Sequence, residues 1–208
     1  NMEADSLNAA ILGEDAAPGT ADFDIFIKEV RREITTKAGQ KCTAVRRIIV
    51  PEKYLEDTQI ALGKALSKTV VGDPAVEGVR MGALVNRSQM EVVRKRVLEM
   101  SETTPVVVGD LDNFDLIGAD KHKGAFLAPL VMLNDDPLNK TQSHEVECFG
   151  PVSTLMPYNG IDEAVELAKM GKGSLVSTIV TSDVTTATDY AVEAAAYHGR
   201  ILILNEAS

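Results

Sequence analysis

The sequence has a shortage of basic residues, of cysteine and of long apolar runs, and each shortage excludes a class of protein. Lys and Arg number 21 against 31 Asp and Glu, which gives a formal net charge of −10. Such a surface repels phosphate backbones and anionic lipids, so we expect no nucleic acid partner. Two cysteines in 208 residues are too few for a disulfide framework, and we expect a reducing, cytoplasmic setting. Apolar stretches such as 126–133 are strand-sized, far below the roughly 20 residues that a membrane helix requires, so we expect no membrane span.

Two kinds of binding motif are also missing. The three histidines, His122, His144 and His198, show no metal-ligand spacing with each other or with the cysteines, so we expect no metal site. No glycine-rich segment of the G-x-G-x-x-G kind follows an expected strand. The chain therefore lacks a self-contained dinucleotide-binding unit.

The chain does contain alternating helical and strand patterns. Apolar residues at spacings of three and four predict helices within 23–39, 55–66, 90–100, 162–170 and 185–197. Short β-branched or apolar runs predict strands at 46–50, 105–109, 126–133, 152–157, 175–181 and 201–204. The runs SLVSTIVT and ILIL are apolar on both faces, as in strands that helices cover on both sides. We predict an α/β fold with a mainly parallel open sheet and helices on both faces. No linker or repeat divides residues 1–208, so we expect one domain.

Cys42 is the residue best placed to be a nucleophile. It lies in the segment 39–44 (GQKCTA), between an expected helix and an expected strand, where a glycine allows close approach of the backbone to a ligand. The thiolate is the reactive form of cysteine, and four nearby basic residues could favour it: Lys37, Lys41, Arg46 and Arg47. A lone cysteine is also compatible with a small buried apolar role, so position alone leaves both readings open.

Three segments resemble motifs of the aldehyde dehydrogenase superfamily and follow the family's order. The segment 39–44, with the strand RRIIVP after it, is similar to the family's nucleophile loop. The segment 147–152 (ECFGPV) is similar to the E-x-F-G-P-V signature, and 199–205 (GRILILN) resembles the family's closing strand. The segment 2–8 (MEADSLN) stands where most members carry E-L-G-G-K-S-P. Its missing glycines and its long separation from Cys42 resemble one subgroup, the bacterial ring-cleavage semialdehyde dehydrogenases.

The resemblance implies a role for each of four residues. Cys42 would be the nucleophile that forms a thiohemiacetal and then a thioester, and Glu3 the general base that activates water to cleave the thioester. Glu147 would accept hydrogen bonds from the nicotinamide ribose hydroxyls, and Phe149 would border that end of the cofactor. Cys148 is expected to be a packed bystander. The implied cofactor is NADP or NAD, and the implied substrate is an aldehyde, in this subgroup a CoA-linked semialdehyde.

The resemblance also implies that these residues are part of a longer protein. In the family the nucleotide-binding domain, and an asparagine of the oxyanion hole, lie mainly N-terminal to the segment that matches here. A C-terminal end follows the closing strand, and members form homo-oligomers by strand addition at a sheet edge. We therefore expect a fragment that is poorly active by itself.

Two readings from other classes remain open. One is a cofactor-free thioesterase or acyl transferase that uses Cys42 and Glu3. The other is a non-catalytic assembly domain that binds partners through its sheet edge and acidic surface. Without the resemblance, Glu147 would be interpreted as a solvated acid and Phe149 as an ordinary core ring. The basic run 94–96 is interpreted as a solvated helix face, with a substrate path as the alternative.

Overall fold

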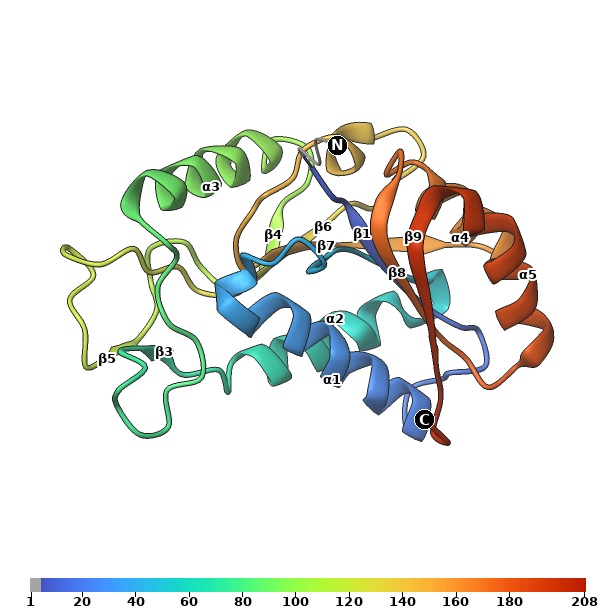
Figure 1. The fold of residues 1–208 in the computed structure, drawn as a ribbon, viewed down its shortest axis with the longest axis horizontal. Helices are drawn as coiled ribbons and strands as arrows, with labels where there is room; N and C mark the ends of the chain where they lie inside the picture. The colour runs from blue at the N-terminus through green and yellow to red at the C-terminus, as the bar shows by residue number, and fades with distance from the viewer. Residues whose placement is uncertain (1–4) are drawn as a thin grey trace.

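A seven-stranded sheet forms the centre of the protein, which we describe from a computed structural model over residues 5–208 (Figure 1). The strand order is β4-β6-β7-β2-β1-β8-β9, and each neighbouring pair is parallel except β4 with β6. A separate two-stranded sheet pairs β3 with β5. The strands are β1 Asn8–Leu12, β2 Val45–Pro51, β3 Val71–Gly72, β4 Val106–Val108, β5 Leu116–Ile117, β6 Leu130–Leu133, β7 Val152–Tyr158, β8 Ser174–Val180 and β9 His198–Leu204.

Helices cover both faces of the large sheet. They are α1 Ala21–Thr35, α2 Leu55–Leu66, α3 Arg87–Met100, α4 Ile161–Lys169 and α5 Val184–Ala194, with short 3-10 turns at Thr36–Gly39, Glu52–Tyr54, Thr141–His144 and Ala195–Tyr197. Helices α1 and α2 lie on one face, and α3, α4 and α5 lie on the other (Figure 1). The predicted α/β fold with a mainly parallel sheet is confirmed.

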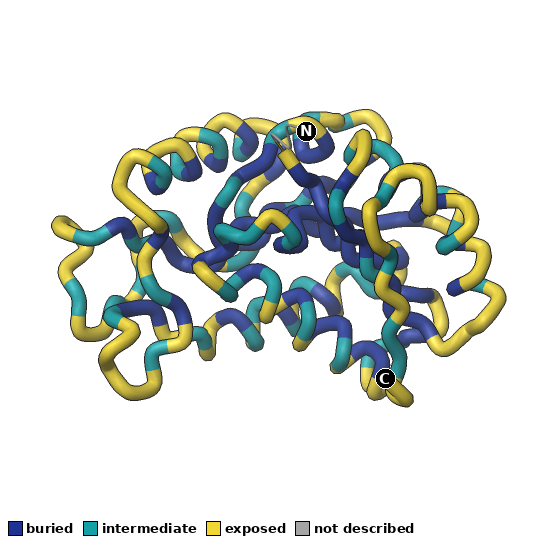
Figure 2. The backbone as a smooth tube through the Cα atoms, viewed as in Figure 1, coloured by how far each residue is buried: buried dark blue, intermediate teal, exposed yellow. Residues whose placement is uncertain are grey.

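The central strands are buried on both sides because their residues alternate between two apolar cores. In β1, Ala10 and Leu12 pack with α1 and α2, whereas Ala9 and Ile11 pack with α4 and α5. Figure 2 shows these inner strands as a continuous buried layer. Burial on both faces explains why the strand sequences are apolar runs rather than alternating ones.

Strand β9 differs from the expectation for the run ILIL. It pairs only with β8 and forms one edge of the sheet. Leu202 is 38% exposed and Ile203 is 43% exposed. The prediction of a strand was right, but the prediction of burial on both faces was wrong. An apolar strand can lie in the centre of a sheet or at its edge, because its sequence does not specify which strands and helices lie beside it.

The expected strand 126–133 is shorter in the structure. Only Leu130–Leu133 forms β6, and residues 126–129 belong to no strand. Pro129 has no N–H to donate to a neighbouring strand, whereas Leu130 N–H donates to the carbonyl of Pro151 at 2.8 Å. Pairing therefore begins directly after the proline.

Candidate active site

Three of the four predicted site residues line one cavity of about 400 Å³. Cys42, Glu147 and Phe149 contribute to it from two loops that lie more than one hundred residues apart in the sequence. The other lining residues are Asp5, Ser6, Gln89, Val92, Val93, Arg96 and Leu175. The fourth predicted residue, Glu3, lies outside the described residues. The cavity therefore joins the start of the described chain to both motif loops.

A strained turn leads from α1 to Cys42. Lys37, Ala38 and Gly39 have successive positive φ angles of 54°, 51° and 68°. Non-glycine residues rarely adopt this region, and strain of this kind is held only where surrounding contacts enforce it. A Cβ on Gly39 would lie 2.1 Å from the carbonyl oxygen of Gly150. Glycine is therefore required where the Cys42 segment approaches the loop after Phe149.

Cys42 is exposed, and a buried asparagine holds its main chain. The Asn8 side-chain amide donates to the carbonyl oxygens of Cys42 and Ala44, at 2.9 Å each. Asn8 Oδ1 accepts from Ser6 Oγ at 2.8 Å and from Val176 N–H at 2.9 Å. One side chain thus fixes the Cys42 turn to β1 and β8. The Cys42 N–H makes no hydrogen bond with another described residue.

The carboxylate of Glu147 is buried and held on both oxygens. Arg46 Nε donates to Oε1 at 3.0 Å, and the main-chain N–H of Ser6 donates to Oε2 at 3.2 Å. The main-chain oxygen of Glu147 accepts from Arg96 Nη1. Glu147 is only 5% exposed, so it is not the solvated acid that its sequence context alone indicates. A buried carboxylate needs such partners to offset its desolvation.

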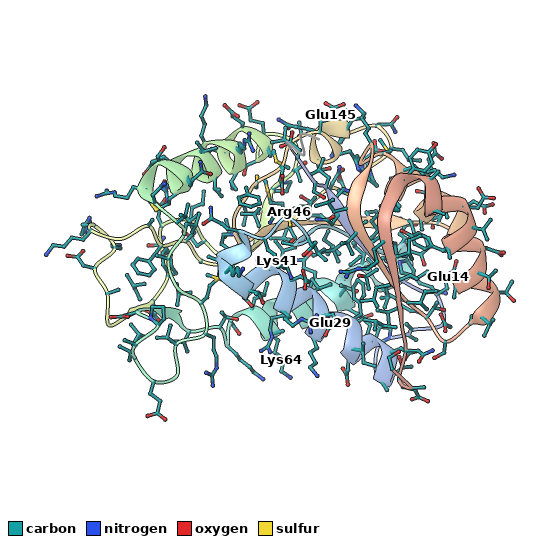
Figure 3. The ribbon with its side chains drawn as sticks, viewed as in Figure 1. Glu14, Glu29, Lys41, Arg46, Lys64 and Glu145 are labelled. Carbon is teal, nitrogen blue, oxygen red and sulfur yellow. The ribbon has the colours of Figure 1, made fainter. Side chains whose placement is uncertain are left out.

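Three of the four basic residues near Cys42 in the sequence are paired or buried in the structure. Lys41 pairs with Glu33 of α1 at 2.7 Å, and Arg46 lies in the centre of the molecule (Figure 3). Arg47 is fully buried, where burial lowers its pKa to about 10. Among residues 5–208 the basic residue that lines the cavity is Arg96, which the sequence placed on a solvated helix face. The sequence left open which of these basic residues point toward Cys42, and in the structure Arg46 and Arg47 are both buried.

Cys148 is packed, as predicted. Its Sγ lies 3.7 Å from Met100 Sδ, and burial raises the pKa of its thiol to about 11. Within residues 5–208, no group of three or more His, Cys, Asp or Glu is arranged to hold a metal ion. In the same range no helix is both long and apolar enough to cross a membrane.

Sequence reasoning missed Asn8 and the structural role of Arg46. Asn8 lies in the segment that was compared with the family motif, but its contacts depend on three strands that meet only in the fold. Arg46 and Arg47 did carry a signal. Two arginines inside the β-branched strand VRRIIVP must be buried with it, and buried charges require partners.

The sequence of the chain is similar to one family of known proteins and to individual bacterial proteins. Residues 1–203 match the aldehyde dehydrogenase family. The chain is 39% identical over 207 residues to a protein of Aromatoleum evansii named 3,4-dehydroadipyl-CoA semialdehyde dehydrogenase, and this match covers 100% of the chain but 40% of the relative. It is 41% identical over 129 residues to Protein MaoC of Klebsiella aerogenes, covering 62% of the chain and 37% of that protein.

Solved structures show the same fold. An aldehyde dehydrogenase from Bacillus cereus superposes with a TM-score of 0.81 at 25% identity, covering 96% of this chain and 38% of that one. A betaine aldehyde dehydrogenase from Staphylococcus aureus, solved with NAD+, also gives a TM-score of 0.81, at 24% identity, covering 96% of this chain and 38% of that one. The chain thus spans about two fifths of the length of the proteins that it matches.

Proposed function

The chain belongs to the aldehyde dehydrogenase family, and we propose that it is the thiol-bearing catalytic domain of an enzyme that oxidises an aldehyde to a carboxylic acid. One observation carries the proposal: exposed Cys42 shares a cavity of about 400 Å³ with Glu147 and Phe149. The cavity is open to a small molecule, and its residues supply a nucleophile, a carboxylate and an aromatic ring. These are the residue types that the proposed roles of Cys42, Glu147 and Phe149 require.

Cys42 would act as the nucleophile. Its Sγ adds to the aldehyde carbon, and the oxygen that becomes negative needs a hydrogen-bond donor. The N–H of Cys42 is available for this because no described residue accepts from it. Asn8 keeps the turn rigid from the buried side, so that the thiol and this N–H stay in one orientation. The second oxyanion donor would come from outside this chain.

Glu147 and Phe149 would hold the nicotinamide end of NADP or NAD. A carboxylate accepts hydrogen bonds from two hydroxyl groups, and that is the donor set of a ribose. Glu147 lines the cavity and has a counter-charge in Arg46. Together with Phe149, it therefore fits the nicotinamide end of the cofactor. When bound, the cofactor supplies the acceptor for the hydride that leaves the Cys42 adduct. The adenosine end would be held by a nucleotide-binding domain in the rest of the protein.

Glu3 would be the general base for the second half of the reaction. It would take a proton from water as the water oxygen attacks the thioester carbon, and cleavage of the C–S bond would then release the carboxylic acid and the Cys42 thiolate. Asp5, two residues after Glu3, lines the cavity. The described part of the chain therefore begins at the cavity, two residues after Glu3 in the sequence.

For the substrate, we propose a CoA-linked semialdehyde produced by cleavage of an aromatic ring. The support for a CoA-linked semialdehyde is the relative from Aromatoleum evansii, whose name specifies one and whose match covers 100% of this chain. The origin in ring cleavage follows from the subgroup that the sequence resembles. We also propose that residues 1–208 are one domain of a protein that contains the nucleotide-binding domain of its relatives, and that this protein is a homo-oligomer.

The test is turnover by the complete gene product. Reduction of NADP and of NAD is measured with an unsaturated CoA-linked semialdehyde, for the wild type and for Cys42→Ala and Cys148→Ala. The proposal requires turnover in the wild type and in Cys148→Ala, and none in Cys42→Ala. Hydrolysis of an activated thioester that needs no nicotinamide and is unaffected by Glu147→Gln would instead establish a thioesterase or acyl transferase.

A further inference from the structure

Arg46 joins the two loops that carry the candidate site residues. Its guanidinium donates three hydrogen bonds: from Nε to Glu147 Oε1 at 3.0 Å, from Nη1 to the carbonyl of Gly150 at 2.8 Å, and from Nη2 to the carbonyl of Gly39 at 2.7 Å. Gly39 ends the strained turn that leads to Cys42, and the other two acceptors belong to the loop of Glu147. One side chain therefore bonds to both sides of the site.

These contacts are made away from water. The side chain of Arg46 is 3% exposed and that of Glu147 is 5% exposed. Burial lowers the pKa of Arg46, and the charge of Glu147 opposes that shift. The Arg46 Cζ also lies 5.4 Å from the centroid of the Phe149 ring, within the range of a cation–π contact. Both residues proposed to meet the cofactor are thus held by the same guanidinium.

Only arginine can make this set of contacts. Its planar head presents five N–H groups in a rigid fork, whereas lysine has a single charged nitrogen on a flexible stem. A lysine at position 46 could pair with Glu147, but it could not at the same time reach the carbonyls of Gly39 and Gly150. The second bridge between the loops is weaker, because Gln40 Nε2 donates once, to the carbonyl of Phe149 at 3.2 Å.

We propose that Arg46 is a positioning residue that fixes the Glu147 carboxylate and the Phe149 ring relative to the Cys42 turn. It acts through Glu147 and Phe149 and does not itself contact the substrate or the nicotinamide. The inference rests on the proposed function, because it assigns these two residues to the cofactor. Its consequence is that loss of Arg46 weakens use of the cofactor by the same route as loss of Glu147.

A double-mutant cycle in the complete gene product separates this role from a purely structural one. Arg46→Met and Glu147→Gln are each expected to lower kcat/KM for the cofactor at least tenfold, by roughly the same factor. The double variant is expected to be within about threefold of the worse single variant, because residues that act as one unit are not additive. The proposal would be overturned if the losses of kcat/KM in the two single variants multiplied in the double variant. It would also be overturned if kcat/KM were unchanged in Arg46→Met.

Arg47 supplies the matched control. It is the neighbouring buried arginine, but its donors go to Leu7, His144, Leu167 and Ala168 rather than to the site loops. The effect of Arg47→Lys is expected to multiply with that of Glu147→Gln. Because Arg46→Met leaves a buried carboxylate unpaired and could prevent folding, Arg46→Lys is measured as well. It is expected to lie between the wild type and Glu147→Gln.

Amide hydrogen exchange tests the inference without turnover. In Arg46→Lys, amides of 39–44 and of 146–152 are expected to exchange at least tenfold faster than in the wild type, because both loops lose the bridge. In Arg47→Lys these two segments are expected to stay within about twofold. Unchanged exchange in Arg46→Lys would overturn the positioning role. A wild type that reduces neither NADP nor NAD would instead overturn the proposed function, and the exchange result would still judge Arg46.

Discussion

The side-chain amide of Asn8 donates to the main-chain oxygen of Cys42 at 2.9 Å. Asn8 is 1% exposed, whereas Cys42 is exposed, so the Cys42 segment is held from its buried side. The same amide also donates to the carbonyl of Ala44 at 2.9 Å. An exposed turn with buried restraints of this kind is rigid before any ligand binds, and a reactive group benefits from such preorganisation.

Asn8→Asp is expected to loosen the Cys42 turn. The change removes both donors and places carboxylate oxygens against two carbonyls, which costs about 1–3 kcal/mol of unfolding free energy. The Ala44 amide, which bonds to the carbonyl of Lys41 at 3.0 Å, should exchange faster. Unfolding by denaturant and amide exchange measure the two effects.

Asn134→Asp is the control for Asn8→Asp. Asn134 is also buried, and its side-chain amide donates to Lys140 O and Ser143 Oγ at 2.8 Å each, away from the cavity. It should lose a similar unfolding free energy without faster exchange at Ala44. Faster exchange in both variants would mean that the turn reports global stability and is not held by Asn8.

The two cysteines should differ sharply in reactivity. Cys42 is exposed, and Cys148 is buried with its thiol pKa raised to about 11. Only the thiolate attacks an alkylating agent, so native protein treated briefly with iodoacetamide should carry one label, on Cys42. Mass spectrometry of the peptides locates it. Cys148→Ser should label at the wild-type rate and Cys42→Ser should label only after unfolding; prompt labelling of native Cys42→Ser would be inconsistent with the packing of Cys148.

Gly39→Ala is expected to be more damaging than the same change at another glycine with positive φ. Both Gly39 (φ 68°) and Gly78 (φ 89°) occupy the left-handed region, but a Cβ at Gly78 would meet nothing within 4 Å. Gly78→Ala should therefore cost only the conformational term, about 1 kcal/mol. Gly39→Ala should cost at least about 2 kcal/mol more, because its Cβ meets the Gly150 carbonyl oxygen. Equal losses of unfolding free energy in Gly39→Ala and Gly78→Ala would show that the loop after Phe149 shifts to accommodate the added methyl group.

Acid should destabilise the protein through His144. Arg47 donates to its Nδ1 and its Nε2 faces the carbonyl of Pro137, at 3.0 Å each, so the ring is neutral with its proton on Nε2. Burial and the Arg47 charge lower the pKa of His144 from 6.5 to about 4. Between pH 6.5 and 4, His144 therefore binds a proton in the unfolded chain but not in the folded chain. The contribution of neutral His144 to the stability of the folded protein is complete above pH 6.5 and is lost as the pH falls toward 4.

The measurement is unfolding free energy as a function of pH for three proteins. Between pH 6.5 and 4, His144→Gln should remove up to about 1.4 kcal/mol per pH unit from the wild-type slope. His198, whose pKa burial also lowers to about 4, keeps a slope in the variant. His122→Gln, at an exposed position, should retain the wild-type slope. A His144→Gln slope equal to that of the wild type would contradict the assignment.

Much of the fold followed from local patterns. The spacing of Phe23, Phe26 and Val30 predicted α1, because these residues form the buried side of that helix. The apolar runs predicted the central strands β2, β7 and β8. The edge position of β9 did not follow, because exposure depends on which strand lies beside it. The proline at position 129 shortened β6, although the same proline was visible in the sequence.

The sequence predicted which residues form the candidate site, but it did not predict the hydrogen bonds that hold them in place. Cys42, Glu147 and Phe149 were each chosen from motifs, and the structure brings them to one cavity. The sequence named Arg46 only as one of four basic residues near Cys42, and the structure shows it bonded to Glu147, 101 positions away in the chain. Such long-range partners are set by the strand order, which no local pattern specifies. The base role of Glu3 remains a prediction, since it lies outside the described residues.

The most direct test of the account is to trap the covalent intermediate on the complete gene product. The protein is mixed with the CoA-linked semialdehyde and NADP or NAD, quenched in acid within one turnover, and digested for peptide mass spectrometry. We predict an acyl group, two hydrogens lighter than the aldehyde adduct, on the peptide that contains Cys42. Formation of reduced nicotinamide with the acyl group on Cys148, or with Cys42 unmodified at every quench time, would contradict the account.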